Sequence, residues 1–154
     1  MTLSASLRAV CFVRVPFTRI RLGVRVACIT VAATLGGLVT LGSRHGGVVE
    51  LFAAGGWALL PAAGVGVTAV AGAVIHTVWI TVWTLLYALV ARAHRGWQAF
   101  AGAVATAVLA YAMAPLVGLG AVGPMSIVTT GERAMLHLVF AFALAAGMRL
   151  ARTW

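Results

Sequence analysis

The sequence predicts an all-α, polytopic membrane protein with four transmembrane helices, and three observations support this class. Hydrophobic residues make up 63% of the 154-residue chain and charged residues only 8%, whereas soluble domains usually carry about 25% charged residues. Long stretches contain no formal charge at all, and the longest runs from residue 51 to 91. The net charge of +9 comes from arginines that lie in short clusters between the apolar stretches, as the positive-inside rule describes.

The same charge distribution argues against nucleic-acid binding, which needs basic residues gathered on one folded, soluble face. The lipid bilayer is the partner that the composition indicates. The chain contains no Lys, Asp or Asn. A GC-rich bacterial genome explains that bias most simply.

The first predicted transmembrane helix covers residues 26–42 and follows a basic segment, residues 1–25. This segment is too long for the start of a signal peptide, and no A-x-A-like cleavage site follows the apolar run. We therefore expect a retained helix that enters the membrane from the cytoplasm. The four-helix transmembrane domain then covers residues 26–152.

The uncharged stretch that follows is too long for one helix and short for two. Gly55, Gly56 and Pro61 interrupt its first part. We interpret residues 51–61 as an interfacial or re-entrant piece, and we predict the second transmembrane helix at about 64–91.

The third and fourth transmembrane helices are predicted at about 97–116 and 133–150. Pro115 ends or kinks the third, because proline cannot continue the helical hydrogen bonds. A glycine-rich connection follows, and then residues 129–132 (Thr-Thr-Gly-Glu) mark the entry to the fourth, since small polar and acidic residues suit a helix N-terminus.

The arginines predict the orientation of these helices. With the N-terminus in the cytoplasm, every arginine except Arg44 and Arg133 lies on the cytoplasmic side, and both glutamates lie on the other side. An even number of spans is needed for this bias, so four are favoured over three or five. We expect a multi-pass protein of the bacterial cytoplasmic (inner) membrane with both termini in the cytoplasm.

Two histidines occupy corresponding positions in what looks like an internal repeat. Residues 72–79 (GAVIHTVW) resemble residues 133–140 (RAMLHLVF), so that His76 corresponds to His137. The repeat predicts two hairpins in the same orientation, related by a pseudo-twofold axis along the membrane normal. It places both histidines at nearly equal depth in the outer half of the membrane.

Small residues recur at every fourth position on each predicted helix, and such rows mark helix–helix contacts in lipid. The positions that we assign to helix packing are Gly36, Gly64, Gly72, Gly102, Ala141 and Ala145. The rows on the second and fourth helices include the two histidines, which are therefore expected to face protein.

Several roles are open for His76 and His137. Each could be a neutral imidazole hydrogen-bonded to a neighbouring helix. Intramembrane ionisable residues are also candidates for function, so the pair could hold a haem or a metal ion, or relay a proton with Glu132. No cofactor is required by the sequence, and the two cysteines, Cys11 and Cys28, form no metal-ligand spacing.

The order of several motifs resembles that of small four-helix bacterial integral membrane proteins of unknown function. The match covers about residues 70–152: His76-x-x-Trp79, the exit of the third helix at residues 113–118 (MAPLVG), and residues 136–140 (LHLVF) on the last helix. Ala141 stands where such relatives have glycine. The resemblance implies a four-helix topology and no activity.

Three functions remain open. The first is a non-catalytic accessory or structural subunit of a larger membrane complex, of respiratory or photosynthetic type, whose partners are other subunits or further copies of the chain. The second is a haem- or metal-binding membrane electron carrier that uses His76 and His137. The third is a small oligomeric transporter or channel. An enzyme is not expected, because no nucleophile–base pair, G-x-S-x-G motif or phosphate-binding loop with a lysine occurs.

Overall fold

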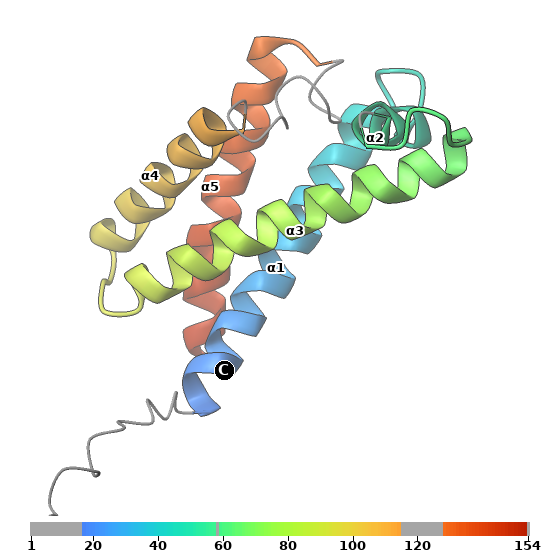
Figure 1. Ribbon diagram of the computed structural model, residues 1–154. Helices are drawn as coiled ribbons and strands as arrows, with labels where there is room; N and C mark the ends of the chain where they lie inside the picture. Colours follow the sequence, from blue (N-terminus) through green and yellow to red (C-terminus); the bar gives the residue numbers. More distant parts are fainter. Residues whose placement is uncertain (1–16, 58, 115–127, 154) are drawn as a thin grey trace, which may run out of the picture.

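All the regular elements of the protein are α-helices in the part of the chain that the computed structural model describes, residues 17–57, 59–114 and 128–153 (Figure 1). They are α1 (Phe17–Gly42), α2 (Val48–Gly56), α3 (Val65–Ala91), α4 (Trp97–Met113) and α5 (Thr130–Thr153). Three stretches, Ile20–Gly42, Val65–Ala91 and Thr130–Thr153, are long and apolar enough to cross a membrane, and α4 is a shorter apolar helix. The structure thus confirms an all-helical protein with three helices that could span a membrane.

Helix boundaries differ from the sequence-based ones mainly at the first helix. It begins at Phe17 rather than at residue 26, because arginine is a good helix former and the basic segment continues the helix. Arg21 and Arg25 are consequently exposed on its first turns. α4 is helical to Met113; the predicted exit at Pro115 and the glycine-rich connection lie outside the described residues, as do Arg8, Cys11 and Arg14.

The uncharged stretch after α1 contains a short helix. α1 turns back through Gly46 and Gly47, whose φ angles of 92° and 147° lie in the region that only glycine adopts readily. α2 then has nine residues, about 14 Å of helix at about 1.5 Å per residue, which is too short to cross a bilayer. The assignment of residues 51–61 to an interfacial or re-entrant piece stays a prediction.

α2 and α3 pack with their backbones almost touching, and glycine makes this possible on both helices. A Cβ atom at Gly72 of α3 would collide with the backbone carbonyl oxygen of Phe52, and one at Gly56 of α2 would collide with that of Thr68. Small residues allow such close approach in the absence of a hydrophobic driving force between helices.

The long helices lie with their basic ends together. α1 and α5 pack along each other in opposite directions, since Gly147 faces Val26 and Gly37 faces Leu136. α3 crosses α1 obliquely, and α4 leads back alongside α5 (Figure 1). One end of the bundle, the arginine end, therefore holds the start of α1, the α3–α4 turn and the end of α5. Its arginines are Arg21, Arg25, Arg92, Arg95, Arg149 and Arg152.

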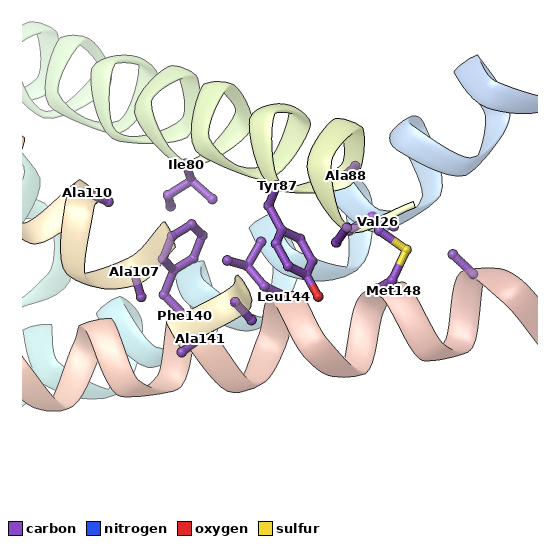
Figure 2. Packing of buried hydrophobic residues seen from close by; sticks show 13 residues of the cluster. Val26, Ile80, Tyr87, Ala88, Ala107, Ala110, Phe140, Ala141, Leu144 and Met148 are labelled. Atoms are coloured by element: carbon purple, nitrogen blue, oxygen red, sulfur yellow. The ribbon is translucent and has the colours of Figure 1, made fainter. Parts of the chain in front are cut away.

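Two apolar clusters fill the interior. The larger, drawn in Figure 2, joins α1, α3, α4 and α5 toward the arginine end, with Tyr87 and Leu144 among its fully buried side chains. The smaller lies toward the opposite end and includes Leu38, Phe52 and Leu136. The space between the two clusters is where the predicted histidine pair lies.

Candidate functional site

His76 of α3 and His137 of α5 line one small cavity inside the bundle. The structure therefore brings together the two residues that the repeat singled out. The cavity has a volume of about 30 Å³, which is room for about one or two water molecules. Its other lining residues are Thr34, Leu38, Trp79, Ile80, Ala110, Leu136 and Phe140.

His137 is oriented by two neighbours. Its Nδ1 lies 2.8 Å from the backbone carbonyl oxygen of Arg133, one turn earlier on α5. Because a carbonyl oxygen only accepts, Nδ1 carries the proton, and in the neutral ring Nε2 is left as an acceptor. The ring of Tyr111 meets the imidazole edge-on, with centroids 5.0 Å apart and planes at 84°. The imidazole is thus held with one nitrogen satisfied and the other available.

His76 has an unsatisfied nitrogen. Its Nε2 is buried and has no hydrogen-bond partner among the described residues. A buried polar atom without a partner costs about 1–3 kcal/mol, so a water molecule or ligand that supplied the missing bond would be stabilised in the cavity. Thr34 offers an acceptor there as well, because its hydroxyl donates to the carbonyl of Thr30, 2.7 Å away, and keeps its own lone pairs.

The cavity is closed along the bundle axis by large apolar side chains. Ile80 and Phe140 separate it from the arginine end, where they join the cluster of Figure 2. Leu38 and Leu136 belong to the smaller cluster toward the opposite end. In the described part of the chain, the polar groups therefore line one small, partly open cavity that ends on apolar side chains in both directions along the bundle.

A second group of polar residues lies beyond the smaller cluster, at the start of α5. Nε2 of His45 lies 3.0 Å from Oε1 of Glu132. The other carboxylate oxygen of Glu132 accepts the backbone N–H of Thr129 at 2.9 Å, while the Thr129 hydroxyl accepts the N–H of Glu132 at 3.3 Å. This reciprocal pair is a capping box, and it provides the helix entry that residues 129–132 predict. The described contacts of Glu132 do not include His76 or His137.

The residues assigned to helix packing occupy different environments. Gly72 and Ala141 are buried, Ala145 packs against the larger cluster, and a Cβ at Gly102 would lie 3.6 Å from the Tyr87 ring. Gly36 and Gly64 are exposed, and nothing lies within 4 Å of the position that a Cβ would take at either.

Some residues of the site could not be found from local sequence patterns. Thr34 and Tyr111 reach the histidines from other helices, and His45 meets Glu132 across 87 residues of chain. The row of small residues on α1 gave no signal for Thr34, because that row lies on the exposed face of the helix and Thr34 lies on the buried one.

The described residues contain no group of three or more His, Cys, Asp or Glu side chains that could hold a metal ion. Cys28 is a free thiol on the exposed face of α1. The histidine pair thus offers two nitrogen ligands, with no further ligand of these types from the described chain.

No family model, no curated protein and no solved structure matches this chain. The predicted resemblance to small four-helix bacterial membrane proteins therefore stays a prediction. The functional assignment depends on the contacts and surfaces of the chain itself.

Proposed function

We propose that this chain is a non-catalytic integral membrane protein that serves as an accessory or structural subunit of a larger membrane complex. The exposed face of α1 is the observation that carries this proposal. Along it runs a row of small residues at every fourth position: Cys28, Ala32, Gly36 and Thr40. The shallow surface they make has open space at Gly36, where no atom lies within 4 Å of the position of a Cβ.

The exposed residues of α1 differ in size from those of α3. The exposed face of α3 consists of branched aliphatic residues, among them Val70, Val74 and Val78, which fill the space beside lipid chains. A row of small residues instead lets a second helix approach the backbone closely. α1 uses its opposite face, with Thr30, Thr34 and Leu38, against its own chain, so the small row is available to a partner helix.

The topology that we propose has four spans, with α4 as the fourth segment beside the three long apolar helices. α4 has 17 residues, about 25 Å of helix against a hydrocarbon core of about 30 Å. The gathering of arginines at one end of the bundle supports a cytoplasmic position for that end and both termini. The shared cavity of His76 and His137 supports the parallel repeat.

Native purification tests the subunit proposal. The protein is extracted from its own membrane in a mild detergent, and its assembly is measured by native electrophoresis and by identification of co-purifying chains. We expect a reproducible complex that Gly36→Leu disrupts, because the leucine fills the shallow surface. Gly66→Leu, the same enlargement at an exposed glycine of α3 with nothing within 4 Å of its Cβ position, should leave the complex intact. A wild-type chain that migrates alone, or a complex that tolerates Gly36→Leu, would refute the proposal.

The second candidate is a haem- or metal-binding electron carrier, and the shared cavity of His76 and His137 is the observation that favours it. A single ion is compatible with about 30 Å³, whereas a porphyrin is far larger and would require the helices to separate. Metal analysis and a visible spectrum of the natively purified protein test both versions. A protein without metal or Soret absorption, unchanged by His76→Ala, would exclude this candidate.

A further inference from the structure

A groove on the outer surface of the bundle lies between α1 and the end of α5, at the arginine end (Figure 1). Its volume is about 330 Å³, and it is lined by Val24, Arg25, Cys28, Ile29, Leu150 and Ala151. The two helices approach closely beside it, because Gly147 of α5 faces the backbone of Val26 without a side chain between them. The groove therefore belongs to the packed contact of α1 with α5.

This groove joins a charged side chain to an apolar surface. Arg25 lines it and is exposed, and Arg21 lies one turn earlier on the same face of α1. Leu150 at its edge is half exposed. Cys28 and Ile29 continue the surface along α1, away from the arginine end. A ligand that fills the groove therefore needs an anionic group joined to a hydrocarbon part.

The arginine end has no acidic side chain to neutralise it. The only two acidic residues of the chain, Glu50 and Glu132, lie at the opposite end, in the first turns of α2 and α5. Arg152 is engaged within the chain, because its guanidinium donates to the carbonyl oxygen of Ala91 at 2.8 Å. Arg25 forms no ion pair in the described part of the chain. Its charge is therefore available to an anion from outside the chain.

The position of the groove indicates where that anion comes from. Arginine clusters mark the level at which apolar helices leave the hydrocarbon, and long arginine side chains there extend to the membrane surface. From Arg25 to Ile29 the groove follows α1 for four residues, about 6 Å into the hydrocarbon. A phospholipid has its phosphate at the first level and an acyl chain at the second. A free phosphate compound or an acidic protein loop would reach Arg25 but leave the apolar part uncovered.

We propose that this α1–α5 groove binds an anionic phospholipid, with the lipid phosphate on Arg25 and one acyl chain along Cys28 and Ile29. The guanidinium donates paired hydrogen bonds to phosphate oxygens, and Arg21 adds attraction from the preceding turn. A zwitterionic lipid binds less well, since the arginines repel its choline cation. The binding is a property of the single chain and does not depend on the proposed role as a subunit. Of the small row on α1, only Cys28 lines the groove.

Native mass spectrometry of the purified full-length chain, delipidated in a neutral detergent, tests this binding. Dioleoyl phosphatidylglycerol is compared with dioleoyl phosphatidylcholine, which has the same acyl chains and no net charge. We expect one saturable phosphatidylglycerol site per chain and roughly 10-fold weaker binding of phosphatidylcholine, as for a charge-assisted hydrogen bond. Glycerol phosphate, which has no acyl chain, should not displace the lipid. Uptake without saturation, equal binding of the two lipids, or displacement by glycerol phosphate would overturn the assignment.

Variants locate the binding in this groove. Arg25→Gln should weaken phosphatidylglycerol binding roughly 10-fold, through the lost charge-assisted hydrogen bonds. Arg95→Gln removes the same charge from an exposed position in the α3–α4 turn, outside the groove, and should leave binding unchanged. Equal losses in the two variants would reduce the effect to net charge and overturn the site.

A second pair of variants tests the apolar part. Cys28→Phe fills it, keeps every arginine, and should abolish the preference for phosphatidylglycerol. Ala146→Phe, at an exposed α5 position outside the groove, is the control and should bind as the wild type does. Circular dichroism verifies that each variant is folded. If Arg25→Gln released an acidic protein from the natively purified chain and left its lipid binding unchanged, the groove would be a protein contact and the lipid assignment would be wrong.

Discussion

The contact between α2 and α3 predicts that two glycine-to-alanine changes on the same helix have opposite effects on stability. At Gly72 a new Cβ would overlap the backbone carbonyl oxygen of Phe52. A backbone atom cannot rotate away, so we take the upper end of the usual overpacking penalty, about 3 kcal/mol. Alanine recovers about 1 kcal/mol of helix propensity. The net loss is about 2 kcal/mol, roughly a 30-fold change in the unfolding equilibrium.

Gly66 is the matched control. It also lies on α3, but nothing is within 4 Å of the position of its Cβ. Gly66→Ala should therefore stabilise the protein by about 0.5–1 kcal/mol, through helix propensity alone. Equilibrium unfolding in mixed micelles, followed by circular dichroism, measures both variants. Hydrogen exchange of the α2 amides shows whether Gly72→Ala releases α2 alone. If Gly72→Ala were as stable as the wild type, with unchanged α2 exchange, the backbone contact would not exist.

Three further changes probe the interior and the arginine end. Leu144→Ala should cost about 2–5 kcal/mol, because the cavity that it leaves adds to the lost burial of the side chain. The exposed Leu138→Ala serves as a near-neutral control in the same unfolding assay. Tyr87→Phe removes a buried hydrogen bond of 2.9 Å to the carbonyl oxygen of Ala99 on α4 and should cost about 1 kcal/mol. An unchanged unfolding midpoint would argue against that bond. Arg152→Met removes the guanidinium that donates to the carbonyl of Ala91 at 2.8 Å. It should accelerate amide exchange in the last turn of α3 and leave α2 unaffected.

Helix class and approximate helix positions could be predicted because they depend on local composition. Uncharged stretches and proline or glycine interruptions are properties of neighbouring residues, and they located α3 to within a residue at each end. The start of α1 at Phe17 was missed, because hydropathy finds the apolar part of a helix and arginine-rich turns outside it remain helical.

The site was only partly predictable. His76 and His137 could be paired from the repeat, which compares two local patterns. Tyr111 could not be connected with them, since its contact with His137 depends on how α4 and α5 pack. Gly36 shows a limit of predicting contacts from small residues. Their spacing identifies a helix face suited to close approach, but it does not say whether another helix of the same chain contacts that face.

Most threonine hydroxyl groups of this bundle bond within their own helix and therefore do not determine which helices pack together. Those of Thr34, Thr77, Thr81, Thr84 and Thr106 each donate to the carbonyl oxygen four residues earlier on the same helix. These groups are therefore satisfied before the helices meet and do not select one neighbour over another. Registry between the helices instead follows from shape, at glycines such as Gly56 and Gly72. A deep mutational scan should accordingly find these glycines intolerant of change, while Thr77 and Thr81 accept serine, valine or alanine.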